Sequence, residues 1–137
     1  MAGHSSPSAD HPNALLLRRA HAAFASGDTE AIGRLFAPDI VSVIPGRSSV
    51  SGTERGIENV LANAAAIMER TNGTYRADTI DYLGTDRHAV ALTRLTAERD
   101  GVKLDIGQVV IFEVVDGKLA NSFHIPYDLY AWDDFIG

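Results

Sequence analysis

The sequence predicts one α+β domain, and three observations lead to this prediction. The chain has 137 residues, which is the length of a single typical domain. Its apolar residues follow a helical spacing in the first half and a strand-like alternation after about residue 74. Two Asp-Gly pairs separate the later apolar runs, and such pairs are typical of tight β-hairpins. Helices followed by a run of strands indicate an α+β layer architecture.

The composition narrows the class of protein. Twelve Lys and Arg residues stand against 18 Asp and Glu residues, and the net charge of −6 disfavours contact with nucleic acid or anionic lipid. The chain has no cysteine, which excludes disulfides, thiolate metal sites and thiol nucleophiles. No stretch approaches the roughly 20 apolar residues that cross a bilayer, and the N-terminus does not resemble a secretory signal. We therefore expect a cytoplasmic protein with no nucleic-acid or membrane partner.

Helices are expected mainly in the first half. Residues 1–12 are rich in Ser, Pro and His and predict a disordered tail, so that the domain spans residues 13–137. Capping and stop signals predict three helices: one from the N-cap Asn13 to Gly27, one capped by Asp28, and one over residues 57–70.

Strands are expected mainly in the second half. A short strand over residues 40–44 and a polar loop over residues 47–56 are followed by strands at about 74–83, 88–99, 102–115 and 118–126, and then by a short closing helix. In residues 104–114 both alternating faces are largely apolar, since Val109 and Ile111 lie opposite the main apolar row. A two-layer fold usually leaves one sheet face in water, so we expect a homodimer to cover the second face.

Several segments together resemble a known superfamily. They are Ala-Phe-Ala-Ser-Gly-Asp at 23–28, Leu-Phe-Ala-Pro-Asp-Ile-Val at 35–41, Pro-Gly at 45–46, Asp-Gly-Lys at 116–118, and the ending at 128–135. The chain resembles the nuclear-transport-factor-two-like superfamily, and within it the SnoaL-like polyketide cyclase and ketosteroid isomerase-like branch. The resemblance implies a cystatin-like α+β roll: a cone-shaped, curved antiparallel sheet packed against three N-terminal helices, usually dimeric, around an apolar pocket. The superfamily contains isomerases, cyclases, epoxide hydrolases, dehydratases and non-catalytic binding modules.

The same resemblance argues against steroid isomerisation. In ketosteroid isomerases a carboxylate base directly precedes the proline that matches Pro45, and here that position holds Ile44. The tyrosine of their oxyanion hole matches Ala20. Neither side chain can move or donate a proton.

Asp128 is the first candidate catalytic residue. It follows the last strand, at a position that resembles the acid/base aspartate of SnoaL-like cyclases. The resemblance implies a carboxylate that removes a proton next to a carbonyl without metal or cofactor, and burial would raise its pKa towards working pH. The alternative is that Asp128 caps the closing helix, because Asp is a preferred N-cap residue.

Three further polar residues are candidates for the site. His124 lies near the end of the last strand and could exchange a proton with Asp128, although alternation alone does not say whether it faces the interior. His21 lies one residue past the missing tyrosine and could replace it as a donor, or lie on the helix surface. Gln108 interrupts an apolar row, so its amide is paired with a neighbour or available to a ligand.

Other side chains could line a pocket for a small apolar molecule: Phe24, Tyr75, Tyr82, Arg94, Phe112, Phe123 and Tyr127. Arg94 could instead be an ion-pair partner. The histidines show no metal-binding spacing, and phosphate-loop and nucleophile-elbow motifs are absent, so no metal or cofactor is expected. We expect an enzyme that transfers a proton on a carbonyl or polyketide-type substrate, leading to cyclisation, isomerisation or dehydration. The alternative is a non-catalytic module of the same fold that binds a ligand or a partner.

Overall fold

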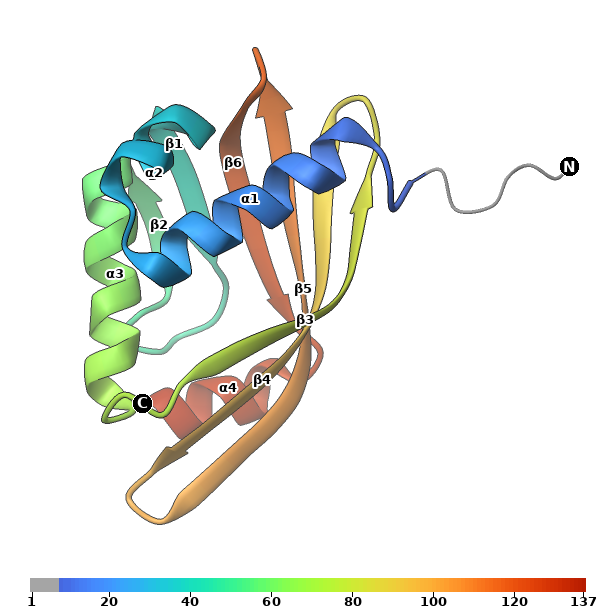
Figure 1. The fold of residues 1–137 in the computed structure, drawn as a ribbon. Coiled ribbons are helices and arrows are strands. Elements are labelled where there is room, and N and C mark those ends of the chain that lie inside the picture. The colour runs from blue at the N-terminus through green and yellow to red at the C-terminus, as the bar shows by residue number, and fades with distance from the viewer. Residues whose placement is uncertain (1–7) are drawn as a thin grey trace, which may run out of the picture.

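A curved sheet of six strands organises residues 8–137, which are the residues described by the computed structural model (Figure 1). The strand order is β2-β1-β6-β5-β4-β3. The elements in chain order are α1 (Pro12–Ser26), α2 (Thr29–Leu35), β1 (Phe36–Ile44), β2 (Gly52–Arg55), α3 (Ile57–Arg70), β3 (Arg76–Gly84), β4 (His88–Arg99), β5 (Val102–Val115), β6 (Lys118–Pro126) and α4 (Leu129–Ile136). The predicted α+β class is confirmed.

Strands β3 to β6 form the predicted antiparallel meander. Both Asp-Gly turns have positive φ at each residue, with 52° and 80° at Asp100 and Gly101, and 51° and 75° at Asp116 and Gly117. This is the geometry of the type I′ turn that joins two strands with two residues. The sheet is mixed rather than wholly antiparallel, because β1 pairs in parallel with β6.

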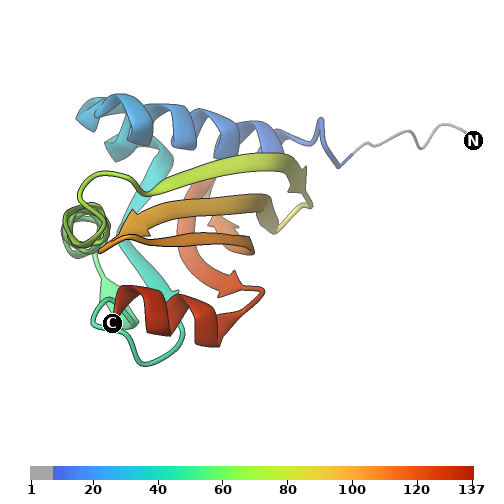
Figure 2. The same ribbon diagram turned by 90° about the horizontal axis from the view of Figure 1, so that it is seen from below.

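The helices cover different parts of the sheet. Helix α1 packs against β3 and β4, α3 against β1 and β2, and α4 against β5 and β6. Figure 2 shows α1 and α4 on opposite sides of the strands, with α3 seen end-on beside them. The three predicted N-terminal helices are confirmed, and the closing segment is the helix α4.

The start of the domain differs from the sequence prediction. Helix α1 begins at Pro12, and its N-cap is His11, whose Nδ1 accepts a hydrogen bond from the backbone N of Asn13 at 3.0 Å. The preceding turn is tied to the β3–β4 connection, since Gly84 N donates to the carbonyl oxygen of Ser8 at 2.9 Å. Residues 8–12 therefore belong to the fold, whereas residues 1–7 of the predicted tail lie outside the described residues.

Strand β2 was not predicted. Its four residues pair antiparallel with β1 at the edge of the sheet and are mostly exposed, so they show no apolar alternation. Strand β1 also begins at Phe36 rather than at Ile40. The predicted polar loop is correspondingly shorter.

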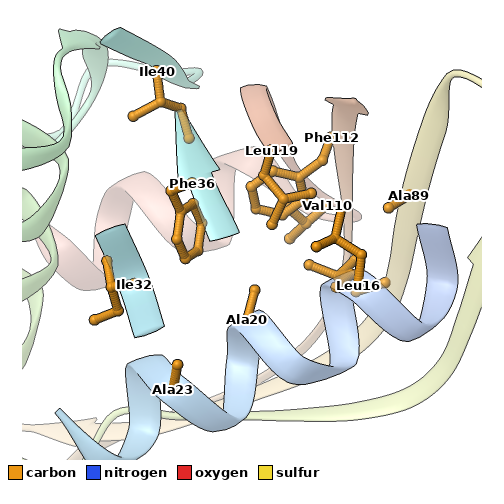
Figure 3. Packing of buried hydrophobic residues seen from close by; sticks show 12 residues of the cluster. Leu16, Ala20, Ala23, Ile32, Phe36, Ile40, Ala89, Val110, Phe112 and Leu119 are labelled. Atoms are coloured by element: carbon orange, nitrogen blue, oxygen red, sulfur yellow. The ribbon is translucent and has the colours of Figure 1, made fainter. Parts of the chain in front are cut away.

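The interior contains two separate apolar clusters. The α1 cluster joins α1 and α2 to the sheet, and Figure 3 shows Leu16 of α1 beside Val110 of β5 within it. Its members are Leu16, Leu17, Ala20, Ala23, Ile32, Phe36, Ile40, Ala89, Ala91, Val110, Phe112 and Leu119. The α4 cluster joins α3 and α4 to the other ends of the strands. Its members are Ile44, Val50, Ile67, Leu95, Ala97, Leu104, Trp132, Phe135 and Ile136.

Candidate functional site

The inner face of β4 is apolar at both ends and polar in the middle. Buried residues alternate along this strand, as expected for a strand with one face towards the core. Ala91 belongs to the α1 cluster and Leu95 to the α4 cluster, and Thr93 lies between them. The two clusters are therefore separated on this strand by a single hydroxyl side chain.

Strands β5 and β1 show the same pattern, with one polar residue between apolar residues of the two clusters. On β5, Gln108 lies between Val110 of the α1 cluster and Leu104 of the α4 cluster. On β1, Ser42 lies between Ile40 and Ile44 in the same way.

Strand register groups these polar residues into two facing pairs at different levels of the inner face. Thr93 lies opposite Gln108, and Ser42 lies opposite Ser122. His124 follows two residues after Ser122 on the same face of β6, opposite Val110. With the His21–Tyr82 pair from α1 and β3, they form a set that we call the polar belt: His21, Ser42, Tyr82, Thr93, Gln108, Ser122 and His124.

Two imidazoles of the belt are held in the neutral form. Burial, followed by repulsion from His21, lowers the pKa of His124 from 6.5 to about 4. Burial likewise lowers the pKa of His21. At neutral pH each ring therefore has one N–H donor and one acceptor nitrogen.

Each imidazole has a hydroxyl neighbour. The His21 Nδ1 atom lies 2.8 Å from the Tyr82 hydroxyl, and His124 Nε2 lies 3.4 Å from Ser42 Oγ. The exposed guanidinium of Arg18 lies 5.0 Å from the centre of the Tyr82 ring, within cation–π distance. Arg18, Tyr82 and His21 thus connect the surface of α1 to the belt.

One belt residue has a buried side-chain atom without a hydrogen-bond partner. Thr93 Oγ1 is fully buried and has no partner within residues 8–137. The Gln108 side chain on the facing strand is 6% exposed. An unpaired buried polar group costs about 1–3 kcal/mol, so the Thr93 hydroxyl destabilises the fold as it stands.

Among the three catalytic candidates, the structure brings together the two histidines and separates Asp128 from them. His21 and His124 lie in the belt, together with the predicted ligand residue Gln108. Asp128 is exposed and caps α4, where its Oδ1 accepts a hydrogen bond from Ala131 N at 3.0 Å. The capping alternative is confirmed, and a catalytic role for Asp128 stays a prediction.

Three of the predicted pocket residues are packed into the clusters or beside them. Phe112 belongs to the α1 cluster, and Phe24 packs edge-on against Phe36 with ring centres 6.4 Å apart. Tyr75 packs against Trp132 beside the α4 cluster, and burial raises its pKa to about 12. Phe112 and Tyr75 support the interior, whereas Phe24 is 38% exposed.

Three other predicted pocket residues lie on the outer face of the sheet. Arg94 Nε donates to Asp105 Oδ1 at 2.8 Å, which confirms the ion-pair alternative. Phe123 is 39% exposed, and Tyr127 packs over Gly107, where any Cβ would clash with the tyrosine ring. The reason is strand alternation, which places these positions opposite the inner face.

The sequence interpretation missed three belt residues, Ser42, Thr93 and Ser122. Each has a signal, because each is a small polar residue in an alternating buried row. The signal becomes specific only when the register shows that two such positions face each other on neighbouring strands, as Ser42 and Ser122 do.

Other kinds of site receive no support within the described residues. No group of three or more His, Asp or Glu side chains in residues 8–137 is placed to hold a metal ion. No helix in this part of the chain is long and apolar enough to cross a membrane.

The sequence of this chain is similar to a known domain family and to known proteins. The sequence model of the SnoaL-like domain matches residues 17–122. The uncharacterized protein Rv0034 of Mycobacterium tuberculosis is 33% identical over 121 residues, which cover 88% of this chain and 92% of that protein.

Two solved structures are similar over nearly the whole chain. Bal32a, from a soil-derived mobile gene cassette, is 36% identical with a TM-score of 0.85, covering 92% of this chain and 97% of Bal32a. A Xanthomonas campestris protein of unknown function with a cystatin-like fold is 27% identical with a TM-score of 0.79, covering 91% and 98%.

Proposed function

Because this chain belongs to the SnoaL-like domain family, we propose that it is an enzyme that moves a proton on a small carbonyl or polyketide-type substrate at the polar belt, without a cofactor. One observation carries the proposal: two neutral imidazoles, His21 and His124, lie near each other beside the α1 cluster, His21 against Tyr82 and His124 opposite Val110. Neutral imidazoles can accept and donate protons at neutral pH without first releasing one to solvent.

His124 is the proposed general base. With a pKa of about 4, its ring is unprotonated at neutral pH and can accept a proton from the carbon next to a carbonyl. A base of this low pKa is weak, so the reaction depends on stabilising the enolate that forms. The electron pair of the broken C–H bond moves to the carbonyl oxygen, which becomes the oxyanion.

His21 is the proposed donor to that oxyanion. If the Tyr82 hydroxyl donates to His21 Nδ1 across their 2.8 Å contact, His21 carries its proton on Nε2 and can donate it to the substrate oxygen. The Arg18 charge over the Tyr82 ring strengthens the tyrosine as a donor. Donors fixed on a developing oxyanion usually supply the largest part of such catalysis.

The enolate can then react in three ways. Returning the proton from His124 to a different carbon completes an isomerisation. Attack of the enolate carbon on a second carbonyl closes a ring, and that alkoxide takes the proton from His124. If His124 then removes a remaining proton from the carbon next to the carbonyl and passes it to the departing hydroxyl, water leaves, a C=C bond forms and a dehydrated product results.

The test is deuterium exchange on 2-tetralone, an apolar ketone, followed by proton NMR in D₂O. The protein should accelerate exchange at the carbons next to the carbonyl, and His124→Gln should lower that rate about 100-fold or more. His88→Gln is the matched control, because His88 lies at the start of β4 outside the belt. Equal rates for His124→Gln and the unchanged protein would remove His124 as the base.

A binding module without catalysis is the second candidate function. It is favoured by the position of Asp128, which caps α4 at the surface and leaves the seven belt residues without a carboxylate. In that case ligands would bind at the belt, but the protein would not accelerate exchange on 2-tetralone over buffer.

We also propose that two copies associate through the outer face of the sheet. Phe123, Ile125 and Tyr127 of β6 and its C-terminal extension are 39%, 43% and 67% exposed. A second copy would remove this apolar surface from water.

A further inference from the structure

The hydroxyl of Ser42 is a buried polar neighbour of the His124 ring. Ser42 Oγ on β1 lies 3.4 Å from His124 Nε2 on β6, in a contact between residues 82 positions apart in the chain. Hydrogen bonds of catalytic groups are often this long in the free enzyme and tighten when the substrate binds. Ser42 is 4% exposed and lies between Ile40 and Ile44 of the two apolar clusters. The Nε2 edge of the His124 ring thus contacts a hydroxyl that apolar side chains flank on its own strand.

This contact admits two arrangements of protons, because a neutral imidazole has one N–H group and a hydroxyl can donate or accept. Burial lowers the pKa of His124, so its ring is neutral at pH 7. If Ser42 donates to Nε2, the ring proton lies on Nδ1, and neither nitrogen has a lone pair free for the substrate. If Ser42 accepts from Nε2–H, the lone pair of Nδ1 is free. The second arrangement alone lets His124 act as a base.

We infer that Ser42 accepts a hydrogen bond from His124 Nε2–H, so that Nδ1 is the atom that takes the proton from the substrate. This inference rests on the proposed function of His124 as the general base. The pairing of β1 with β6 fixes the two side chains, since Ser42 lies opposite Ser122 and His124 follows two residues later on the same face. Ser42 acts through His124 and is therefore a positioning residue.

Ser42 also stabilises the charged form of His124 during the reaction. When Nδ1 takes the proton from carbon, the C–H electron pair moves to the carbonyl oxygen, and the ring becomes a cation with an N–H group on each nitrogen. A hydrogen bond from a charged donor is roughly twice as strong as one between neutral groups. The bond to Ser42 therefore strengthens while the buried ring is charged and weakens when Nδ1 returns the proton. This bond offsets part of the burial that makes His124 a weak base.

Nitrogen NMR of the imidazole rings tests the arrangement of protons in the free protein at pH 7. Protonated and unprotonated ring nitrogens give well-separated signals, and the signals of His124 are assigned by their loss in His124→Gln. We expect a protonated Nε2 and an unprotonated Nδ1 in His124. A protonated Nδ1 would overturn the inference.

Variants at Ser42 test its effect on the base. Ser42→Ala should lower the kcat of deuterium exchange on 2-tetralone about tenfold, the factor for one lost hydrogen bond, and should leave KM within about twofold. The His124 Nε2 proton should exchange with water about tenfold faster in this variant, because it has lost its acceptor. Ser42→Thr keeps the hydroxyl and should restore both rates. Equal losses in Ser42→Ala and Ser42→Thr would reduce the role of Ser42 to packing and overturn the inference.

Ser122→Ala is the matched control for the NMR measurement. It removes the same group from the same face of the sheet, directly opposite Ser42. Because the printed contact of His124 Nε2 is with Ser42, the exchange of the Nε2 proton should stay unchanged in Ser122→Ala. Faster exchange in Ser122→Ala than in Ser42→Ala would contradict the assignment of Ser42 as the acceptor.

These outcomes are separate from those of the proposed function, because the NMR measurement requires no turnover. A protein with a protonated Nε2 that never accelerates deuterium exchange keeps the Ser42–His124 hydrogen bond and loses the enzyme. A protein that needs His124 for exchange but carries the ring proton on Nδ1 keeps the enzyme and loses the role of Ser42.

Discussion

The low pKa of His124 makes the stability of the fold depend on pH in a specific way. The ring has a pKa of 6.5 when unfolded and about 4 when folded, so the unfolded chain binds the extra proton more readily. The full stabilisation is present above pH 6.5 and is lost as the pH falls towards 4. These two values give a loss of about 2 kcal/mol between pH 7 and pH 5, and roughly 3 kcal/mol once the pH is below 4. Because the ring keeps some accessible surface, these figures are upper bounds.

Urea unfolding followed by circular dichroism at pH 7 and pH 5 measures this difference. In His124→Gln the free energy of unfolding should fall less over this interval, by up to about 2 kcal/mol, than in the unchanged protein. His88→Gln should keep the original pH dependence. His21, whose pKa burial also lowers, should leave a smaller dependence of the same sign in His124→Gln. Identical pH dependence in His124→Gln and the unchanged protein would refute the claim that the His124 ring is buried and neutral.

Three further predictions concern other parts of the molecule. Gly46→Ala should lower the free energy of unfolding by about 2 kcal/mol or more, because its φ of +104° is strained for Ala and the new Cβ would clash with the Asp133 side chain. Gly33→Ala, in α2 with open space around it, should instead raise the free energy of unfolding by about 0.5–1 kcal/mol, measured by the same urea unfolding. Ile125→Glu should halve the molar mass measured by light scattering, and a monomeric unchanged protein would contradict the proposed dimer. Asp128→Asn should leave folding intact, because Asn caps helices as well as Asp, and unchanged deuterium exchange would then exclude Asp128 from the mechanism.

Most of the fold could be predicted from local signals. The bounds of β5 and β6 follow from the Asp-Gly turns, and α3 follows from its apolar spacing after Gly56. The parallel pairing of β1 with β6 could not be predicted, because nothing local specifies a partner about 80 residues away. The sequence did not predict strand β2 for a different reason: a short exposed edge strand needs no apolar alternation.

The site was predictable only in part. Gln108 was recognised because an amide in an apolar row is unusual, and His124 because of its chemistry. The face of His124 required the β5–β6 register, which placed it inward opposite Val110. Asp128 shows most clearly where prediction of the site from sequence ends, because an aspartate at this position could serve as a helix cap or as a catalytic base.

The separation of the two apolar clusters has a consequence for how this scaffold can diversify. On β1, β4 and β5 a polar residue lies between apolar residues of the two clusters, so the polar side chains and the hydrophobic interior are encoded by different residues. A handful of exchanges at these polar positions can therefore alter what is recognised or transformed while both halves of the interior stay packed. Such modularity is a physical reason why one architecture hosts many unrelated reactions.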